Sequence, residues 1–157
     1  MQDFGQQYVV QRSQAAVVIG WLVFLFGLIT ILMTPLSLID AVDLDGNPIT
    51  IPTHVKIISI VLNIIVGLMY IVGGLKLKDY EREGAWISLG AVLFAFAGGL
   101  IVYSIYPGGS QIYGPEIGPI FDVSLIAGTA CCSVFCGAII AIPLILANGG
   151  LEKKHSF

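Results

Sequence analysis

Charged residues are scarce in this chain of 157 residues. Asp, Glu, Lys and Arg make up 11% of the sequence, against about 25% in a typical soluble domain. Hydrophobic residues make up 57%, which is more than a soluble domain could keep away from water. The composition therefore predicts an integral membrane protein, with the lipid bilayer as its solvent. The net charge of −3 leaves no basic footprint for nucleic acid.

Asp, Glu, Lys, Arg and His are absent from the middle of every long apolar run. Ion-coupled transporters and proton relays usually keep such a group at membrane depth, so this absence argues against a pump or a secondary transporter. It also removes the base that acid–base catalysis inside the membrane would need. We therefore predict a protein that is not an enzyme and that needs no cofactor.

We expect no cleavable leader, because residues 1–13 lack the basic region and the short apolar core of a signal peptide. The first apolar run is then a retained span. The hydropathy predicts one domain over residues 1–157, an up-down-up-down bundle of four membrane-spanning helices. These spans cover about residues 14–39, 55–75, 84–106 and 121–147.

The one dense run of charge, KLKDYEREG at residues 76–84, separates the second span from the third. Such a cluster cannot lie in hydrocarbon, so it predicts a water-facing turn. If this turn is cytoplasmic, both termini are cytoplasmic as well. Six of the seven basic residues then lie inside and only Lys56 lies outside, which is the asymmetry of the positive-inside rule.

Two loops are predicted on the outer side. The first, residues 40–53, carries the turn signal Asp45-Gly46 between β-compatible residues, which predicts a short β-hairpin. The second, residues 107–120, is rich in glycine and proline, and we expect no regular helix in it. The acidic residues near Asp43 form an ordinary polar turn, and loose calcium binding with Glu116 or Asp122 is left open.

Cysteine is rare, and all three copies fall in the fourth span, at Cys131, Cys132 and Cys136. They do not form a CxxC motif, and no histidine is near enough to complete a zinc site. We interpret them as small packing residues and predict no metal.

Small residues are abundant at spacings of four, which lets membrane helices approach closely. The predicted packing or partner interface comprises Ser124, Gly128, Cys132 and Cys136, a second row of Ser133, Gly137 and Ala141, and Gly98 and Gly99 in the third span. Asn63 is the most polar side chain near the middle of a span, and we expect it to make a polar contact between helices.

These patterns favour an accessory or structural membrane subunit that binds other membrane helices, as a homo-oligomer or within a larger complex. A small channel or a solute or lipid carrier, formed by oligomerisation, is the first alternative, and it would need Asn63, Thr30 and Ser59 to face a wet lumen. The second is an intramembrane thiol enzyme using the three cysteines, which lack a partner base.

Overall fold

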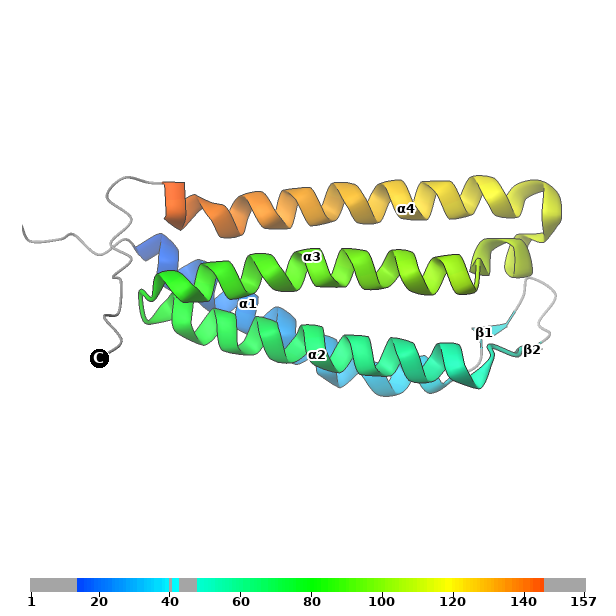
Figure 1. Ribbon diagram of the computed structural model, residues 1–157, viewed down its shortest axis with the longest axis horizontal. Helices are drawn as coiled ribbons and strands as arrows, with labels where there is room; N and C mark the ends of the chain where they lie inside the picture. Colours follow the sequence, from blue (N-terminus) through cyan, green and yellow to red (C-terminus); the bar gives the residue numbers. More distant parts are fainter. Residues whose placement is uncertain (1–13, 40, 43–47, 146–157) are drawn as a thin grey trace, which may run out of the picture.

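The computed structural model describes residues 14–39, 41–42 and 48–145. Four long helices run alternately in opposite directions along the molecule (Figure 1). They are α1 (Gln14–Met33), α2 (Thr53–Lys78), α3 (Arg82–Ile105) and α4 (Gly108–Ile145). All four are long and apolar enough to cross a membrane, which confirms the expected fold of four such helices.

Helix α1 passes into a short 3-10 helix, η1 (Thr34–Leu38). Pro35 lies at the start of this segment, where its missing N–H leaves no hydrogen bond unmade. The described chain then contains two strands of two residues each, β1 (Ala41–Val42) and β2 (Pro48–Ile49), which pair antiparallel. The expected β-hairpin is not supported beyond these two residue pairs, and so small a ribbon is marginal on its own. The Asp45-Gly46 turn and the cluster near Asp43 lie outside the described residues, as do residues 1–13 and 146–157.

Glycine pairs hold α1 against α2. A Cβ added to Gly20 would lie 2.8 Å from the carbonyl oxygen of Gly74, and one added to Gly27 would lie 2.7 Å from that of Gly67. The two glycines of α1 are seven residues apart, and so are the two glycines of α2. Seven residues make about two turns, so each helix presents its two glycines on one face. The two backbones are therefore in direct contact at two levels, as small residues allow in membrane helices.

The α2–α3 contact is built in the same way. A Cβ added to Gly84 would lie 2.7 Å from the carbonyl oxygen of Gly73. Ser88 is fully buried there and donates its hydroxyl to the carbonyl oxygen of Gly84 at 2.8 Å. Because Gly73 and Gly74 are neighbours, about 100° apart around the helix axis, α2 meets α3 on one side and α1 on the other.

The charged stretch between α2 and α3 forms a tight turn. Only Asp79, Tyr80 and Glu81 lie between the two helices, and Tyr80 adopts a left-handed conformation with φ of 65°. The ammonium of Lys76 contacts the carboxylates of Glu83 at 2.6 Å and Glu81 at 3.1 Å. Much of the charge cluster is thus helical, and a three-residue turn reverses the chain.

The glycine- and proline-rich segment at residues 107–120 corrects one expectation, because it is helical. Helix α4 begins at Gly108 and is broken at Gly114, where φ is 77° and ψ is 175°. Glycine reaches this left-handed region without steric cost, and the following Pro115 favours the extended ψ. The chain therefore turns sharply between a short helix and a long one, as the kink in Figure 1 shows.

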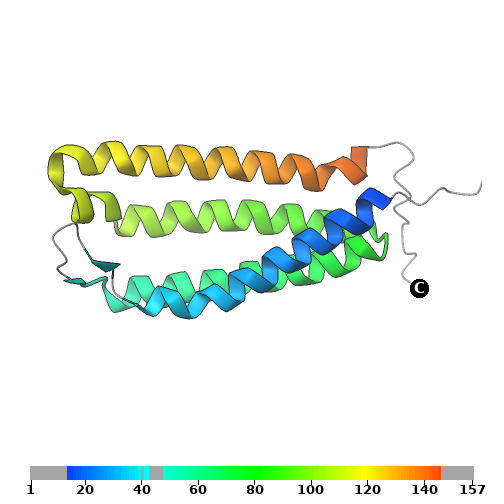
Figure 2. The same ribbon diagram turned by 180° about the vertical axis from the view of Figure 1, so that it is seen from behind.

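Helix α4 is the least covered of the four. In the apolar stretch of α4, 6% of the residues are buried, against 22–28% in the corresponding stretches of the other three helices. It lies along α3 in both views, while α1 crosses obliquely in front of α2 in the view of Figure 2. The hydrophobic core accordingly centres on α1, α2 and α3, to which α4 adds Ile140, 4% exposed.

Candidate binding cleft

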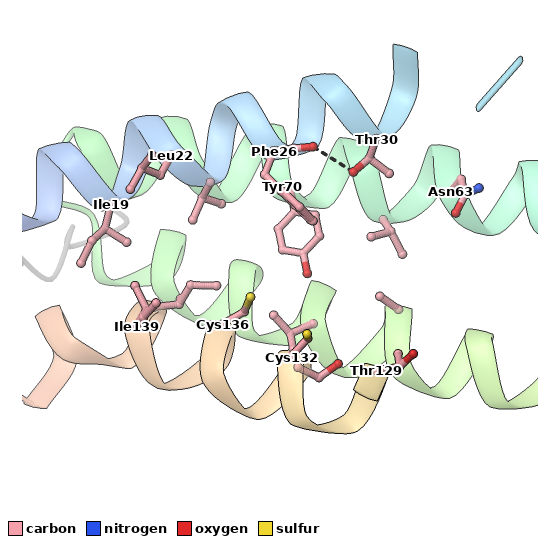
Figure 3. A pocket seen from close by; sticks show the side chains of 16 residues that line it. Ile19, Leu22, Phe26, Thr30, Asn63, Tyr70, Thr129, Cys132, Cys136 and Ile139 are labelled. Carbon is pink, nitrogen blue, oxygen red and sulfur yellow. Dashed lines mark hydrogen bonds between the residues drawn. The ribbon is translucent and has the colours of Figure 1, made fainter. Parts of the chain in front are cut away.

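A cleft of about 440 Å³ lies between α1 and α4, with α2 and α3 behind it (Figure 3). Helix α1 contributes Ile19, Leu22, Val23, Phe26 and Thr30, and α4 contributes Thr129, Cys132, Ser133, Cys136, Ile139 and Ile140. Asn63, Val66 and Tyr70 come from α2, and Val92 and Ala95 from α3. The walls are mostly apolar, with a few polar groups among them, which is the usual make-up of a ligand site.

Two threonines in the cleft have already used their hydroxyl hydrogens. Thr30 Oγ1 donates to the carbonyl oxygen of Phe26, and Thr129 Oγ1 donates to that of Leu125, each at 2.8 Å. Such bonds to the preceding turn are common for hydroxyl side chains within helices. Both threonines therefore present only acceptor lone pairs to the cleft.

Tyr70 is the most deeply placed polar side chain of the cleft, with 6% of its surface exposed. Its ring packs edge-on against Phe26, with ring centroids 5.4 Å apart and planes at 85°. Its hydroxyl points across the cleft toward α4, where Cys132 and Cys136 lie (Figure 3). No hydrogen bond joins this hydroxyl to any residue that the structure describes. The ring is thus fixed by packing, while its polar end faces open space.

Asn63 and Ser133 also line the cleft, and both are half-buried. Within the described ranges neither side chain makes a hydrogen bond. The polar contact between helices expected for Asn63 therefore stays a prediction. Together with Tyr70, these residues place three unused donor groups around one space.

The cysteines are divided between two surfaces. Cys132 and Cys136 line the cleft, whereas Cys131 does not, and all three are free and exposed. Across the described part of the chain, no three His, Cys, Asp or Glu residues come close enough to hold a metal ion.

The remaining residues of the predicted interface are scattered over α3 and α4. Ser124 and Gly128 are exposed, and a Cβ added to Gly128 would meet nothing within 4 Å. Gly137 faces α3, where its Cβ would lie 3.8 Å from Leu89, and Ser133 and Ala141 are half-buried on the same helix.

The two glycines of α3 have different surroundings. Gly98 packs against Leu62 of α2, at 3.1 Å from the position of an added Cβ, whereas the corresponding position at Gly99 is open. The cleft therefore gathers Asn63, Cys132, Ser133 and Cys136 from the predicted set and leaves the others apart.

Several features escaped the sequence interpretation. The sequence could have pointed to Tyr70, because it lies far from either end of its span, whereas the tyrosines of membrane proteins are enriched at the membrane interfaces. Asp122, grouped with the outer acidic residues, is 2% exposed at the start of the long part of α4 and interacts within the chain. The seven-residue glycine spacing of α1 and α2 was likewise visible in the sequence.

No protein-family model, curated protein or solved structure matches this chain.

Proposed function

We propose that the protein is a non-enzymatic accessory or structural subunit of a membrane protein complex or of a homo-oligomer, and that it binds another transmembrane helix through α4. The observation that carries this proposal is the exposure of α4: in its apolar stretch, only 6% of the residues are buried inside the molecule. The partner is a second copy of this chain or a helix of a larger complex.

The glycines of the molecule support a helical partner. Gly20, Gly27, Gly74 and Gly84 each lie within 3 Å, measured from an added Cβ, of a neighbouring helix backbone. Gly128 is also a glycine, but a Cβ added to it would meet nothing within 4 Å. A glycine facing lipid gains nothing over leucine, whereas a glycine facing a helix permits close packing. A partner helix beside Gly128 would therefore give this position the role that glycine has between α1, α2 and α3.

The same proposal places the chain in the membrane with both termini and the α2–α3 turn in the cytoplasm. Lys76, Lys78 and Arg82 mark that end, and by sequence Arg12, Lys153 and Lys154 belong to it. Lys78 lies over the ring of Trp21, 5.1 Å from its centroid. An aromatic ring and an ammonium at a helix end are typical of the membrane interface.

The test replaces Gly128 and Gly137 separately with leucine. We expect Gly128→Leu to disrupt assembly and to leave a folded monomer, because its side chain enters the partner's place. Gly137→Leu should instead impair folding, because α3 lies in front of it. Size in mild detergents and crosslinking in the native membrane measure assembly. A protein that is monomeric in several detergents, crosslinks to nothing and tolerates both leucines would refute the proposal.

A small carrier is the second candidate, and the cleft is the observation that favours it. A water-filled channel has less support, because the lining is mostly apolar and Thr30 has its hydroxyl hydrogen bonded to its own helix. A thiol enzyme also has little support, since no described His, Asp or Glu lines the cleft beside Cys132 and Cys136.

A further inference from the structure

The cleft has the dimensions of a small-molecule site. Its lining along α1 runs from Ile19 to Thr30, which is about 16 Å at 1.5 Å per residue. The cleft holds about 440 Å³, within the range of about 300–1,000 Å³ typical of small-molecule sites.

The polar groups of the cleft lie deep between the helix ends. Tyr70 is about 12 Å along α2 from Lys78, and Asn63 is about 15 Å from Thr53, at 1.5 Å per residue. In a bilayer with a hydrocarbon core of about 30 Å, both would lie beyond the reach of phospholipid headgroups. A plain acyl chain has no polar group to offer them at this depth. Whatever satisfies these side chains must therefore carry its own polar group into hydrocarbon.

The available hydrogen-bonding groups define the chemistry of that polar group. Tyr70, Ser133 and Asn63 have donor hydrogens that no described residue accepts, whereas the threonine hydrogens are already used. Unused donors call for an acceptor. None of the described lining residues is Asp, Glu, Lys, Arg or His, so a charged ligand would be left uncompensated. A neutral carbonyl meets both conditions.

We propose that this cleft binds a neutral, lipid-soluble carbonyl compound, whose carbonyl oxygen accepts a hydrogen bond from the hydroxyl of Tyr70. The apolar remainder of the molecule lies along α1 and α4, between Ile19 and Cys136. Asn63 and Ser133 provide the further donors for a second polar group. Gly128, proposed to face a partner helix, does not line the cleft, although it lies one turn before Cys132 on the same row of α4.

The test uses two probes of similar shape. One is a benzoquinone whose ring is fully substituted and bears a decyl chain, so that the thiols of Cys132 and Cys136 have no free ring position to attack. The other is decylbenzene with the same remaining ring substituents, which keeps the shape and lacks only the two carbonyls. Each is added to the full-length protein in lipid nanodiscs, and the amount retained is compared with that in empty discs. We expect saturable retention of the quinone at one molecule per chain, and retention of decylbenzene that is weaker by at least the roughly 3- to 10-fold that one lost hydrogen bond would cause.

Three variants locate the site. Tyr70→Phe keeps the ring that packs on Phe26 and removes only the hydroxyl, so it should weaken quinone binding roughly 3- to 10-fold, as expected for one lost hydrogen bond. Cys132→Phe fills the cleft from the exposed side of α4 and should abolish binding. Gly128→Leu should bind the quinone like the wild type, even where it disrupts assembly. Circular dichroism establishes that each variant has retained its helices.

Four results would overturn this inference: quinone retention no greater than in empty discs, equal retention of both probes, unchanged affinity in Tyr70→Phe, or undiminished binding in Cys132→Phe. Equal retention would identify a hydrocarbon slot for acyl chains. Because Gly128→Leu tests assembly and Tyr70→Phe tests ligand binding, failure of one proposal is distinguishable from failure of the other.

Discussion

Gly27 of α1 and Gly67 of α2 lie in backbone contact, since a Cβ added to Gly27 would sit 2.7 Å from the carbonyl oxygen of Gly67. Neither the carbonyl oxygen nor the helix that carries it can move aside as a flexible side chain would. The contact therefore sets the separation of the two helices at this level.

We predict that Gly27→Leu strongly destabilises the fold. The added side chain forces α1 away from α2, and overpacking of this kind costs typically about 1–3 kcal/mol or more. Thermal unfolding in mild detergent, followed by loss of helical circular dichroism, measures the effect. Gly99→Leu is the matched control, because a Cβ there meets nothing within 4 Å. Equal melting temperatures for the two variants would contradict the predicted packing.

The kink in α4 leads to a second prediction. Gly114 has φ of 77° and ψ of 175°, a combination that is essentially confined to glycine and that costs a residue with a Cβ about 1–3 kcal/mol. Gly114→Ala should therefore lower the melting temperature or straighten the kink, whereas Gly108→Ala, with open space and no positive φ, should be nearly neutral. If both alanines behave alike, the left-handed conformation at Gly114 is not needed.

Orientation in the membrane is tested by labelling. In a variant with Cys131, Cys132 and Cys136 replaced, Asp45→Cys, Tyr80→Cys and Ser110→Cys are introduced one at a time. The positive-inside asymmetry predicts that an impermeant maleimide added outside intact cells labels positions 45 and 110 but not position 80. Labelling at position 80 alone would reverse the proposed topology.

The cysteines give a fourth prediction. Replacing Cys131, Cys132 and Cys136 together with alanine should leave a folded protein that inserts into membranes, because all three are exposed and free. Metal analysis of the purified wild type should find no stoichiometric zinc. Zinc bound one to one in the wild type and lost in the triple variant would show that these residues form a metal site.

The helices could be predicted because each apolar run is long enough to identify a span by itself. The helical nature of residues 108–120 was missed because its two halves are joined at a single glycine, Gly114, whose left-handed conformation composition does not reveal. The contact between Gly20 and Gly74 was missed because spacing along one helix does not show which helix lies opposite. The cleft could not be predicted, because it depends on the angle at which α1 passes α4. Residues far apart in the sequence set this angle.

The adjacency of Gly73 and Gly74 has a mechanical consequence. Because α2 touches α3 through one glycine and α1 through the next, these three helices form a stiff block whose parts cannot separate independently. Gly128 and Gly137 of α4 make no such backbone contact: a Cβ added to Gly137 would meet the side chain of Leu89 at 3.8 Å, and one added to Gly128 would meet nothing within 4 Å. The Gly114 kink lies near the start of α4. Lateral displacement of α4 would widen or narrow the cleft without opening any of the glycine contacts. The candidate binding cleft thus lies beside the helix that is held least tightly, so a bound molecule would set the position of α4 relative to the other three helices.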